Sequence, residues 1–340
     1  MARRVVRLVD VATEAGVGTS VVSRVLNGDP TLSIRDETRQ RIVNTARRLE
    51  YRPNGFARGL KLARTMTIGL VINLGYSENA NLIAAVERAA AHLGYMTLLA
   101  DASEFISRGG NYGRLLMERR VDGLLMASGL GDDAFVRELR DYRLPIVVVN
   151  RRVRGVVPSV SLDDAVGMRV AVEHLIELGH TRIAYIGGPP RNDVSRRRLA
   201  GYKAAIRGAN LRVSAGLVTE SSEHEEGGFE AGKRLLEGRR PPTAVAVWSA
   251  TVAVGALAAI RRSGHQVPRD ISIISLHDAK IGDYLEPPLA TVRMPVPKLA
   301  SVAVESLIKL VEGQDVEDTI ITEPSPVVVR RGSTAVPPSA

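Results

Sequence analysis

The fold is decided near the N-terminus, where the chain reads Val11-Ala12-Thr13-Glu14-Ala15-Gly16-Val17-Gly18-Thr19-Ser20-Val21-Val22-Ser23-Arg24-Val25-Leu26-Asn27. Apolar side chains recur at helical spacing on both sides of Gly16, at Leu8, Val11, Ala12 and Ala15 and then at Val21, Val22, Val25 and Leu26. Gly16 itself supplies the left-handed backbone of a tight turn. Two such helices indicate a helix-turn-helix, whose second helix enters the DNA major groove by its N-terminal residues. The alternative left open by the pattern alone is a small packed helical bundle.

A third amphipathic helix is predicted over 33–50, with Ser33 as its N-cap and Asp36 placed almost as in a capping box. Its apolar stripe runs through Thr38, Ile42, Ala46 and Leu49. The chain then reads Tyr51-Arg52-Pro53-Asn54-Gly55-Phe56-Ala57-Arg58-Gly59-Leu60-Lys61.

The formal charge of +9 is spread unevenly along the 340 residues. The first 64 residues hold thirteen Lys and Arg against six Asp and Glu, a net +7, and the rest carries only about +2. A small basic module on a nearly neutral body indicates an anionic polymer as partner, and the helix-turn-helix pattern points to double-stranded DNA.

The chain has no cysteine, which excludes disulfides, thiolate zinc sites and cysteine nucleophiles. No apolar run of signal-peptide or membrane-spanning length is present, so a cytoplasmic protein with no membrane partner is expected. Phosphate-binding loops, His-Glu-x-x-His and Gly-x-Ser-x-Gly motifs are missing as well. We therefore expect no enzyme, no cofactor and no metal site.

After Arg64, short apolar runs alternate with amphipathic helical patterns, which indicates βαβ units and parallel sheets. The first series has strands at 67–72, 95–100, 121–127 and 145–150, with helices near 79–93, 112–119 and 132–142. The second has helices near 163–178, 195–209, 227–237 and 250–263, with strands at 182–187, 243–248 and 271–276. Two doubly wound sheets in succession imply a cleft between them, with ligands at the carboxyl ends of the strands.

Several segments resemble the LacI/GalR family of bacterial transcription repressors: Asp10-Val11-Ala12, Ala15-Gly16-Val17, Val22-Ser23-Arg24-Val25-Leu26-Asn27-Gly28, Tyr51-Arg52-Pro53-Asn54 and Ala57-Arg58-Gly59-Leu60. The likeness continues to the C-terminus. It implies an N-terminal all-α helix-turn-helix headpiece and an α/β core of two doubly wound parallel-sheet subdomains, periplasmic-binding-protein-like in form. The implied boundaries are 1–51 for the headpiece, 52–64 for a hinge helix, 65–162 with 293–323 for the first subdomain, and 163–292 with 324–340 for the second.

The same resemblance implies a regulator that binds a palindromic operator. Thr291-Val292-Arg293-Met294-Pro295 is similar to the family's last crossover, after which a helix near 298–312 returns to the first sheet. The tail 332–340 has no leucine heptad, so a homodimer is expected rather than a tetramer. An activator or an effector-independent regulator is the runner-up, and an exported solute-binding protein is disfavoured by the basic headpiece.

Carried over residue by residue, the resemblance assigns base contacts to Thr19, Ser20 and Arg24. Asn27, Thr38 and Arg39 fall at phosphate-positioning places. For Thr19 and Ser20, simple N-capping of the second helix is the alternative role.

The hinge is predicted to be helical only when it is bound. Gly55 and Gly59 each cost up to about 1 kcal/mol relative to Ala, and a helix of two turns is marginal in water. By resemblance, the DNA contacts of this segment are Asn54, Ala57, Leu60 and Lys61, with Leu60 wedged into the minor groove. An ordinary linker residue is the alternative for Leu60. A ligand that changes the angle between the subdomains would shift the hinge between ordered and frayed states.

The candidate effector residues are Arg198, which matches the family's effector-contacting arginine, together with Asn150, His277 and Asp278. The family pattern breaks around them. Ala250-Thr251 replaces a usual Asn-Asp, His277-Asp278 replaces Asp-Asp, and Tyr76-Ser77-Glu78-Asn79 replaces Asn-Pro-Phe-Phe. An altered sugar or sugar phosphate, a different small molecule, or no effector stay open. His277 is either a pH-sensitive ligand contact or a strand-end histidine, and Arg198 either an effector contact or a salt bridge across the cleft.

Overall fold

The computed structural model describes residues 6–26, 28–29, 31–51, 64–76, 78–102, 120–127, 144–153, 155–238 and 240–338. The chain divides into two compact units, Met1–Thr65 and Met66–Ala340, each considered by itself below. The predicted helices near 112–119 and 132–142 and nearly all of the hinge lie outside the described residues.

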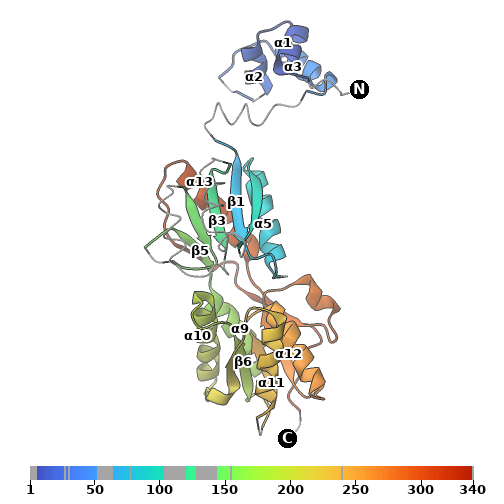
Figure 1. Cartoon of the computed structure of the whole chain (residues 1–340), viewed down its shortest axis with the longest axis vertical. Helices are drawn as coiled ribbons and strands as arrows, with labels where there is room; N and C mark the ends of the chain where they lie inside the picture. The colour runs from blue at the N-terminus through green and yellow to red at the C-terminus, as the bar shows by residue number, and fades with distance from the viewer. Residues whose placement is uncertain are drawn as a thin grey trace. The chain divides into compact units, whose positions relative to one another are not determined.

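In the described part of the N-terminal unit, three helices pack around a small apolar centre (Figure 1). They are α1 (Leu8–Ala15), α2 (Thr19–Leu26) and α3 (Asp36–Arg48). Val11, Val22 and Ile42, one from each helix, are completely buried at the centre. Gly16 ends α1 with φ +64°, the left-handed conformation that the turn requires. The helix-turn-helix prediction is therefore confirmed.

The third helix starts later than predicted, at Asp36, with Arg35 as its N-cap. Ser33 is not the cap, so that prediction is wrong. Leu32 and Ile34 explain the difference, because both pack against the apolar centre of the headpiece and hold the chain there outside the helix.

The described residues of the larger unit form two six-stranded sheets. In spatial order the first sheet is β11 (Thr319–Ile321), β5 (Ser159–Leu162), β4 (Ile146–Val149), β3 (Gly123–Ala127), β1 (Thr67–Ile72) and β2 (Met96–Asp101). All its strands are parallel. β1, β3 and β4 are buried nearly throughout, as expected for strands that are covered on both faces.

The second sheet has the order β12 (Val327–Val329), β10 (Ala290–Arg293), β9 (Ser272–Leu276), β8 (Ala244–Val247), β6 (Ile183–Gly187) and β7 (Val218–Glu220). Only β12 is antiparallel to its neighbour. The chain crosses between the sheets three times, after β5, after β10 and between β11 and β12.

Helices cover both sheets (Figure 1). The first carries α5 (Asn79–His92) and α13 (Val296–Val311), and the second carries α9 (Asp164–Glu177), α10 (Asp193–Gly208), α11 (Glu225–Leu236) and α12 (Ala250–Arg262). Helices α11 and α12 lie so close that a Cβ on Gly255 would stand 1.8 Å from the carbonyl oxygen of Glu225. The predicted class, a helical headpiece with two parallel-sheet α/β subdomains, is confirmed.

The short strands β5, β7, β10, β11 and β12, which lie at or next to the sheet edges, were not predicted as strands. Each has only three or four residues, too few for a clear apolar pattern. The C-terminal tail also has a structural role, since Ser333 is fully buried. Its hydroxyl donates to the Ile273 carbonyl (2.6 Å) and accepts from the Ala290 amide (2.7 Å), which joins the tail to the second sheet.

Candidate functional site

The start of α2 presents two side chains that have no hydrogen-bond partner among the described residues. Thr19 and Ser20 are exposed, and neither side chain makes a hydrogen bond to any part of the chain that the structure describes. The first helical turn instead bonds to Gly18, whose carbonyl accepts from the amides of Val21 (3.0 Å) and Val22 (3.2 Å). The N-capping role considered for Thr19 and Ser20 is therefore absent, and both side chains are available to a ligand.

Arg24, one turn further along α2, is held by an acidic neighbour. Its Nε donates to Asp29 (2.8 Å) and its Nη2 donates to the hydroxyl of Thr31 (2.9 Å). Hydrogen bonds from Thr31 and Arg24 also hold the pKa of Asp29 well below its usual value. The pair is partly exposed, with 35% of the Arg24 side chain and 29% of Asp29 open to solvent. Another anion can therefore reach Arg24.

The other predicted DNA contacts fall into two groups. Thr38 and Arg39 lie half-buried on α3, where the Arg39 guanidinium donates to the Leu32 carbonyl (3.2 Å). The remaining ones lie outside the described residues: Asn27, Asn54, Ala57, Leu60 and Lys61.

A cavity of about 70 Å³ lies within the larger unit, between residues that follow strands of both sheets. Its lining brings together three of the predicted effector residues, Asn150, Arg198 and His277. The volume holds a few water molecules and is far below the roughly 300–1,000 Å³ of drug-sized ligand sites. A larger ligand would require the walls to separate.

Arg198 is fixed on every side. Its Nε donates to Asp164 (2.8 Å), its Nη1 to the Trp248 carbonyl (2.6 Å), and its Nη2 to Nε2 of His277 (2.6 Å). Only 3% of the Arg198 side chain and none of Asp164 is exposed. The guanidinium also lies 5.4 Å from the centre of the Trp248 ring. Arg198 therefore shapes the wall of the cavity and its charge is already neutralised.

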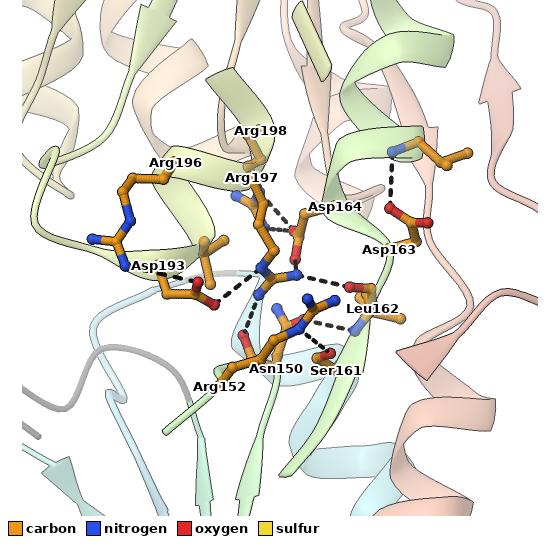
Figure 2. A network of polar contacts seen from close by, with 12 residues as sticks. Asn150, Arg152, Ser161, Leu162, Asp163, Asp164, Asp193, Arg196, Arg197 and Arg198 are labelled. Carbon is orange, nitrogen blue, oxygen red and sulfur yellow. Dashed lines mark hydrogen bonds and ion pairs between the residues drawn. The ribbon is translucent and has the colours of Figure 1, made fainter. Parts of the chain in front are cut away.

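The neighbouring Arg197 joins the two subdomains (Figure 2). It donates to Asp164 (2.5 Å) and Asp193 (3.0 Å) on the side of the second sheet. It also donates to the carbonyls of Leu162 (2.8 Å) and Asn150 (3.3 Å) from the first. Arg197 and Arg198 thus face two aspartates at the cleft, and the more exposed Arg196 adds a longer ion pair to Asp193 (3.8 Å).

His277 and Asn150 both adopt left-handed backbone at the ends of central strands, with φ of +64° and +57°. The guanidinium of Arg198 has only N–H donors, so Nε2 of His277 must accept the hydrogen bond between them. A ring nitrogen that accepts carries no proton, and the imidazole of His277 is therefore neutral. Burial and the charge of Arg198 accordingly lower the pKa of His277 to about 3. The geometry therefore favours a neutral strand-end histidine over a pH-sensitive contact at His277. The Asn150 side chain accepts from the Leu162 amide (3.2 Å), which holds it at the cavity wall.

Side chains from the two subdomains also meet directly across the cleft. The hydroxyl of Tyr76, after β1, donates to Glu223 (2.5 Å), after β7. Thr251 of α12 donates to the Glu78 carboxylate. The Asn81 amide of α5 donates to the Asp278 carbonyl (2.8 Å).

Comparison with known proteins identifies both units. Residues 7–54 match the model of bacterial regulatory proteins of the lacI family, and residues 172–334 match the periplasmic binding protein-like domain. The ribose operon repressor of Haemophilus influenzae is 33% identical over 94% of this chain and 96% of its own length. The chain belongs to the LacI family.

Solved structures of LacI-family proteins agree. A LacI family regulator from Mycobacterium smegmatis superposes with a TM-score of 0.74 at 36% identity, covering 79% of this chain and 99% of its own. The lac repressor dimer bound to operator and an anti-inducer gives 0.78 at 27% identity, covering 97% and 99%. The protein is therefore a DNA-binding repressor of the LacI family with an effector-binding domain, and not an enzyme. None of the helices in its described part is long and apolar enough to cross a membrane.

One predicted effector residue of this LacI-family cleft points elsewhere. The Asp278 carboxylate accepts from Thr291 (2.9 Å), Arg293 (2.7 Å) and Arg331 (2.8 Å). Although burial opposes it, these hydrogen bonds lower the pKa of Asp278. Asp278 does not line the cavity; it lies in a neighbouring surface groove.

Sequence reasoning missed several residues that build the cleft: Asp164, Asn192, Arg197, Glu223 and Trp248. Glu223 follows the unpredicted strand β7, and Asp164 lies 34 residues before Arg198 in the chain. Glu78 and Thr251 stand at positions where the sequence already departs from the LacI/GalR pattern. That departure was the one signal that could have placed them in the site.

Proposed function

We propose that this LacI-family protein is a homodimer that represses transcription by holding two headpieces on a palindromic operator. The observation that carries the proposal is the start of α2, where Thr19 and Ser20 are exposed and have no hydrogen-bond partner among the described residues. Side chains at this place in a helix-turn-helix reach base edges in the major groove. Arg24 joins them by exchanging Asp29 for a guanine or a phosphate.

Phosphate positioning falls to Asn27, Thr38 and Arg39, which would set the register of the headpiece. Through the hinge, Asn54, Ala57, Leu60 and Lys61 would meet the minor groove, with Leu60 as the wedge. Because residues 52–64 make a weak helix by composition, their order would depend on the paired hinge and the DNA.

An apolar edge supports the homodimer. Met96, Leu98 and Leu99 of β2 are exposed by 73%, 47% and 42%, at the outer strand of the first sheet. Ile281 and Tyr284 are exposed as well. Apolar side chains gathered on one edge strand indicate an association surface. The lac repressor relative was solved as an operator-bound dimer, and a partner chain would cover this edge here.

The proposed switch is a small molecule in the cleft, with Arg198, Asn150 and His277 shaping its wall. The bonds of Arg197 and Tyr76 join the subdomains, so a ligand that displaces either changes the angle between them. That angle sets the spacing of the two hinges and therefore the affinity for operator. As a regulator of transcription, the protein would act in the cytoplasm.

A second candidate is a regulator without an effector. The direct bonds from Tyr76 to Glu223 and from Thr251 to Glu78 favour it, since they close the cleft with the chain's own side chains. A metabolite panel titrated into the operator complex separates the two. Release or tightening by one compound supports the switch, and an unchanged complex with every compound supports the second candidate.

The main test selects binding sites from random duplex DNA with the full-length protein. We expect a palindrome bound by two chains, as measured by sedimentation of the complex. Leu60→Gly should keep the dimer and weaken binding to the palindrome far more than to random DNA. Recovery of no palindrome, or one chain per site, would refute the proposal.

Dimer formation has its own test, because Met96→Glu places a charge at the apolar edge. We expect this variant to sediment as a monomer. Val336→Glu, at another exposed apolar position, is the matched control and should leave the dimer intact.

A further inference from the structure

Two carboxylates, Glu78 and Glu223, line the cavity without an ion pair to any described residue. Glu223 accepts from the Tyr76 hydroxyl (2.5 Å) and the Asn192 amide (3.2 Å), and Glu78 accepts from the Thr251 hydroxyl. Both line the cavity. Within the part of the chain that the structure describes, neither forms an ion pair with lysine, arginine or histidine.

The cation beside them cannot compensate. Arg198 is the only lysine or arginine among the described residues that line the cavity, and Asp164 already neutralises it. His277 is neutral, since its Nε2 accepts from Arg198. Arg197 and Arg198 are matched by Asp164 and Asp193, and Arg196, which also pairs with Asp193 (3.8 Å), is 59% exposed and does not line the cavity. Among the described residues that line the cavity, no positive charge is therefore left to compensate the two carboxylates.

The negative charge of the two carboxylates affects the neighbouring Tyr76. Burial, the hydrogen bond to Glu223 and the charges of Glu223 and Glu78 raise the pKa of Tyr76 above its usual value. The rings of Tyr76 and Trp248 also line the cavity, and aromatic faces attract cations. Independently, Trp248 is 6% exposed and its indole Nε1 has no acceptor among the described atoms. A buried donor left unsatisfied at a cavity wall indicates a missing acceptor.

We propose that the cleft binds a small organic cation, a protonated amine that also carries a hydrogen-bond acceptor, between Glu78 and Glu223. The inference rests on the proposed role of the cleft as an effector site and names its ligand class. The amine would take the place of the neutral hydroxyl donors, because hydrogen bonds from a charged donor to a carboxylate are the stronger ones. Neutral sugars lack the charge, and sugar phosphates carry the wrong sign.

The test is calorimetry of ligand binding to the full-length protein without DNA, in buffer with a chelator so that divalent metals do not contribute. The probes are glucosamine, glucose and glucose 6-phosphate, which share one ring and differ in charge, together with ethanolamine and 1,4-diaminobutane. We expect at least one amine to bind, and glucose and glucose 6-phosphate to bind more weakly by roughly tenfold or more.

Glu78→Gln and Glu223→Gln keep the shape and remove the charge. Each should weaken amine binding by roughly ten- to a hundredfold. Glu226→Gln, at an exposed glutamate that does not line the cavity, is the matched control and should bind like the wild type. Circular dichroism and operator binding report whether each variant is folded.

Failure of every amine, preference for glucose or glucose 6-phosphate, or unchanged binding in both glutamine variants would overturn the inference. Operator binding is measured on the same protein and separates this outcome from failure of the proposed function. A protein that binds a palindrome but no amine is still a regulator. A protein that binds an amine without any change in operator affinity keeps the ligand class and loses the switch.

Discussion

Arg24 in the headpiece and Arg198 in the core look alike in the sequence, since each was predicted to contact a ligand. Their surroundings differ. Arg24 pairs with Asp29 at the surface, whereas Arg198 pairs with Asp164 in the interior. An exposed pair contributes little and can exchange partners, while a buried pair cannot lose one partner without leaving an uncompensated charge. Arg24 therefore suits reversible recognition, and Arg198 suits the support of a site whose ligand is bound by other groups.

The largest expected effect tests the buried side of this comparison. Asp164→Asn leaves Arg197 and Arg198 without their shared buried carboxylate, so the free energy of unfolding should fall by about 3–5 kcal/mol. Urea denaturation followed by circular dichroism measures the loss. Asp193→Asn is the matched control, because Asp193 is more exposed and should cost less. Equal losses in the two variants would contradict the distinction.

For the exposed pair of Arg24 and Asp29, we expect a substitution to weaken DNA recognition and not stability. Arg24→Lys keeps the charge but loses the planar fork that pairs with guanine, so binding to the selected operator should weaken by about 1–3 kcal/mol. Binding to random duplex should change little. Fluorescence anisotropy on both duplexes measures the two affinities. Arg39→Lys serves as control, since a phosphate contact tolerates lysine and both affinities should stay close to wild type. Equal weakening on both duplexes would remove Arg24 from base reading.

The difference between local patterns and contacts of distant residues explains which elements could be predicted from the sequence. The first two helices of the headpiece are set by local signals, namely the apolar spacing around Gly16, and every apolar position predicted for them lies within α1 or α2. The start of α3 was not predicted correctly, because Leu32 and Ile34 are drawn to the apolar centre by contacts that no local pattern reports. Long buried strands such as β1 and β9 were predicted from their apolar runs, and three-residue edge strands were missed.

In the cleft, the family resemblance selected Asn150, Arg198 and His277, and all three line the same cavity. The resemblance did not predict what each of them does there. Whether an arginine is free or neutralised depends on residues distant in the chain, and Asp164 and Trp248 reach Arg198 only through the fold. Likewise, Glu223 accepts from Tyr76 only because the fold places residues of the two subdomains opposite each other across the cleft. Such pairings lie beyond any spacing rule.

A pH measurement sharpens the contrast at Arg198. His277 has its pKa lowered to about 3 in the folded protein, against about 6.5 when unfolded. The unfolded state therefore binds the proton first, and the free energy of unfolding should fall as pH drops from about 6.5 towards 3, by up to about 1.4 kcal/mol per pH unit.

The matched variant is His277→Gln, which retains an acceptor for Arg198 and cannot titrate. Its stability should fall less steeply with pH than that of the wild type. The remaining slope includes His174 and His180, whose pKa values are also lowered by burial. The free energy of unfolding is measured by urea titration at several pH values. If it changes equally steeply with pH in the wild type and in the variant, His277 is not held neutral.

The smallest expected effect concerns Asp29. Its lowered pKa keeps it charged at any pH above the usual range of aspartate, so its pairing with Arg24 should not vary with pH near neutrality. Asp29→Asn keeps an oxygen for the Thr31 amide and removes the charge that competes with DNA for Arg24. Operator affinity should rise by a few fold, because the arginine no longer exchanges one anion for another.

Glu37→Gln changes the net charge of the headpiece equally without touching Arg24, so anisotropy titrations of the two variants separate the release of Arg24 from general charge. Equal gains would mean that Asp29 acts only through net charge, and the exposed pair would then have no part in recognition.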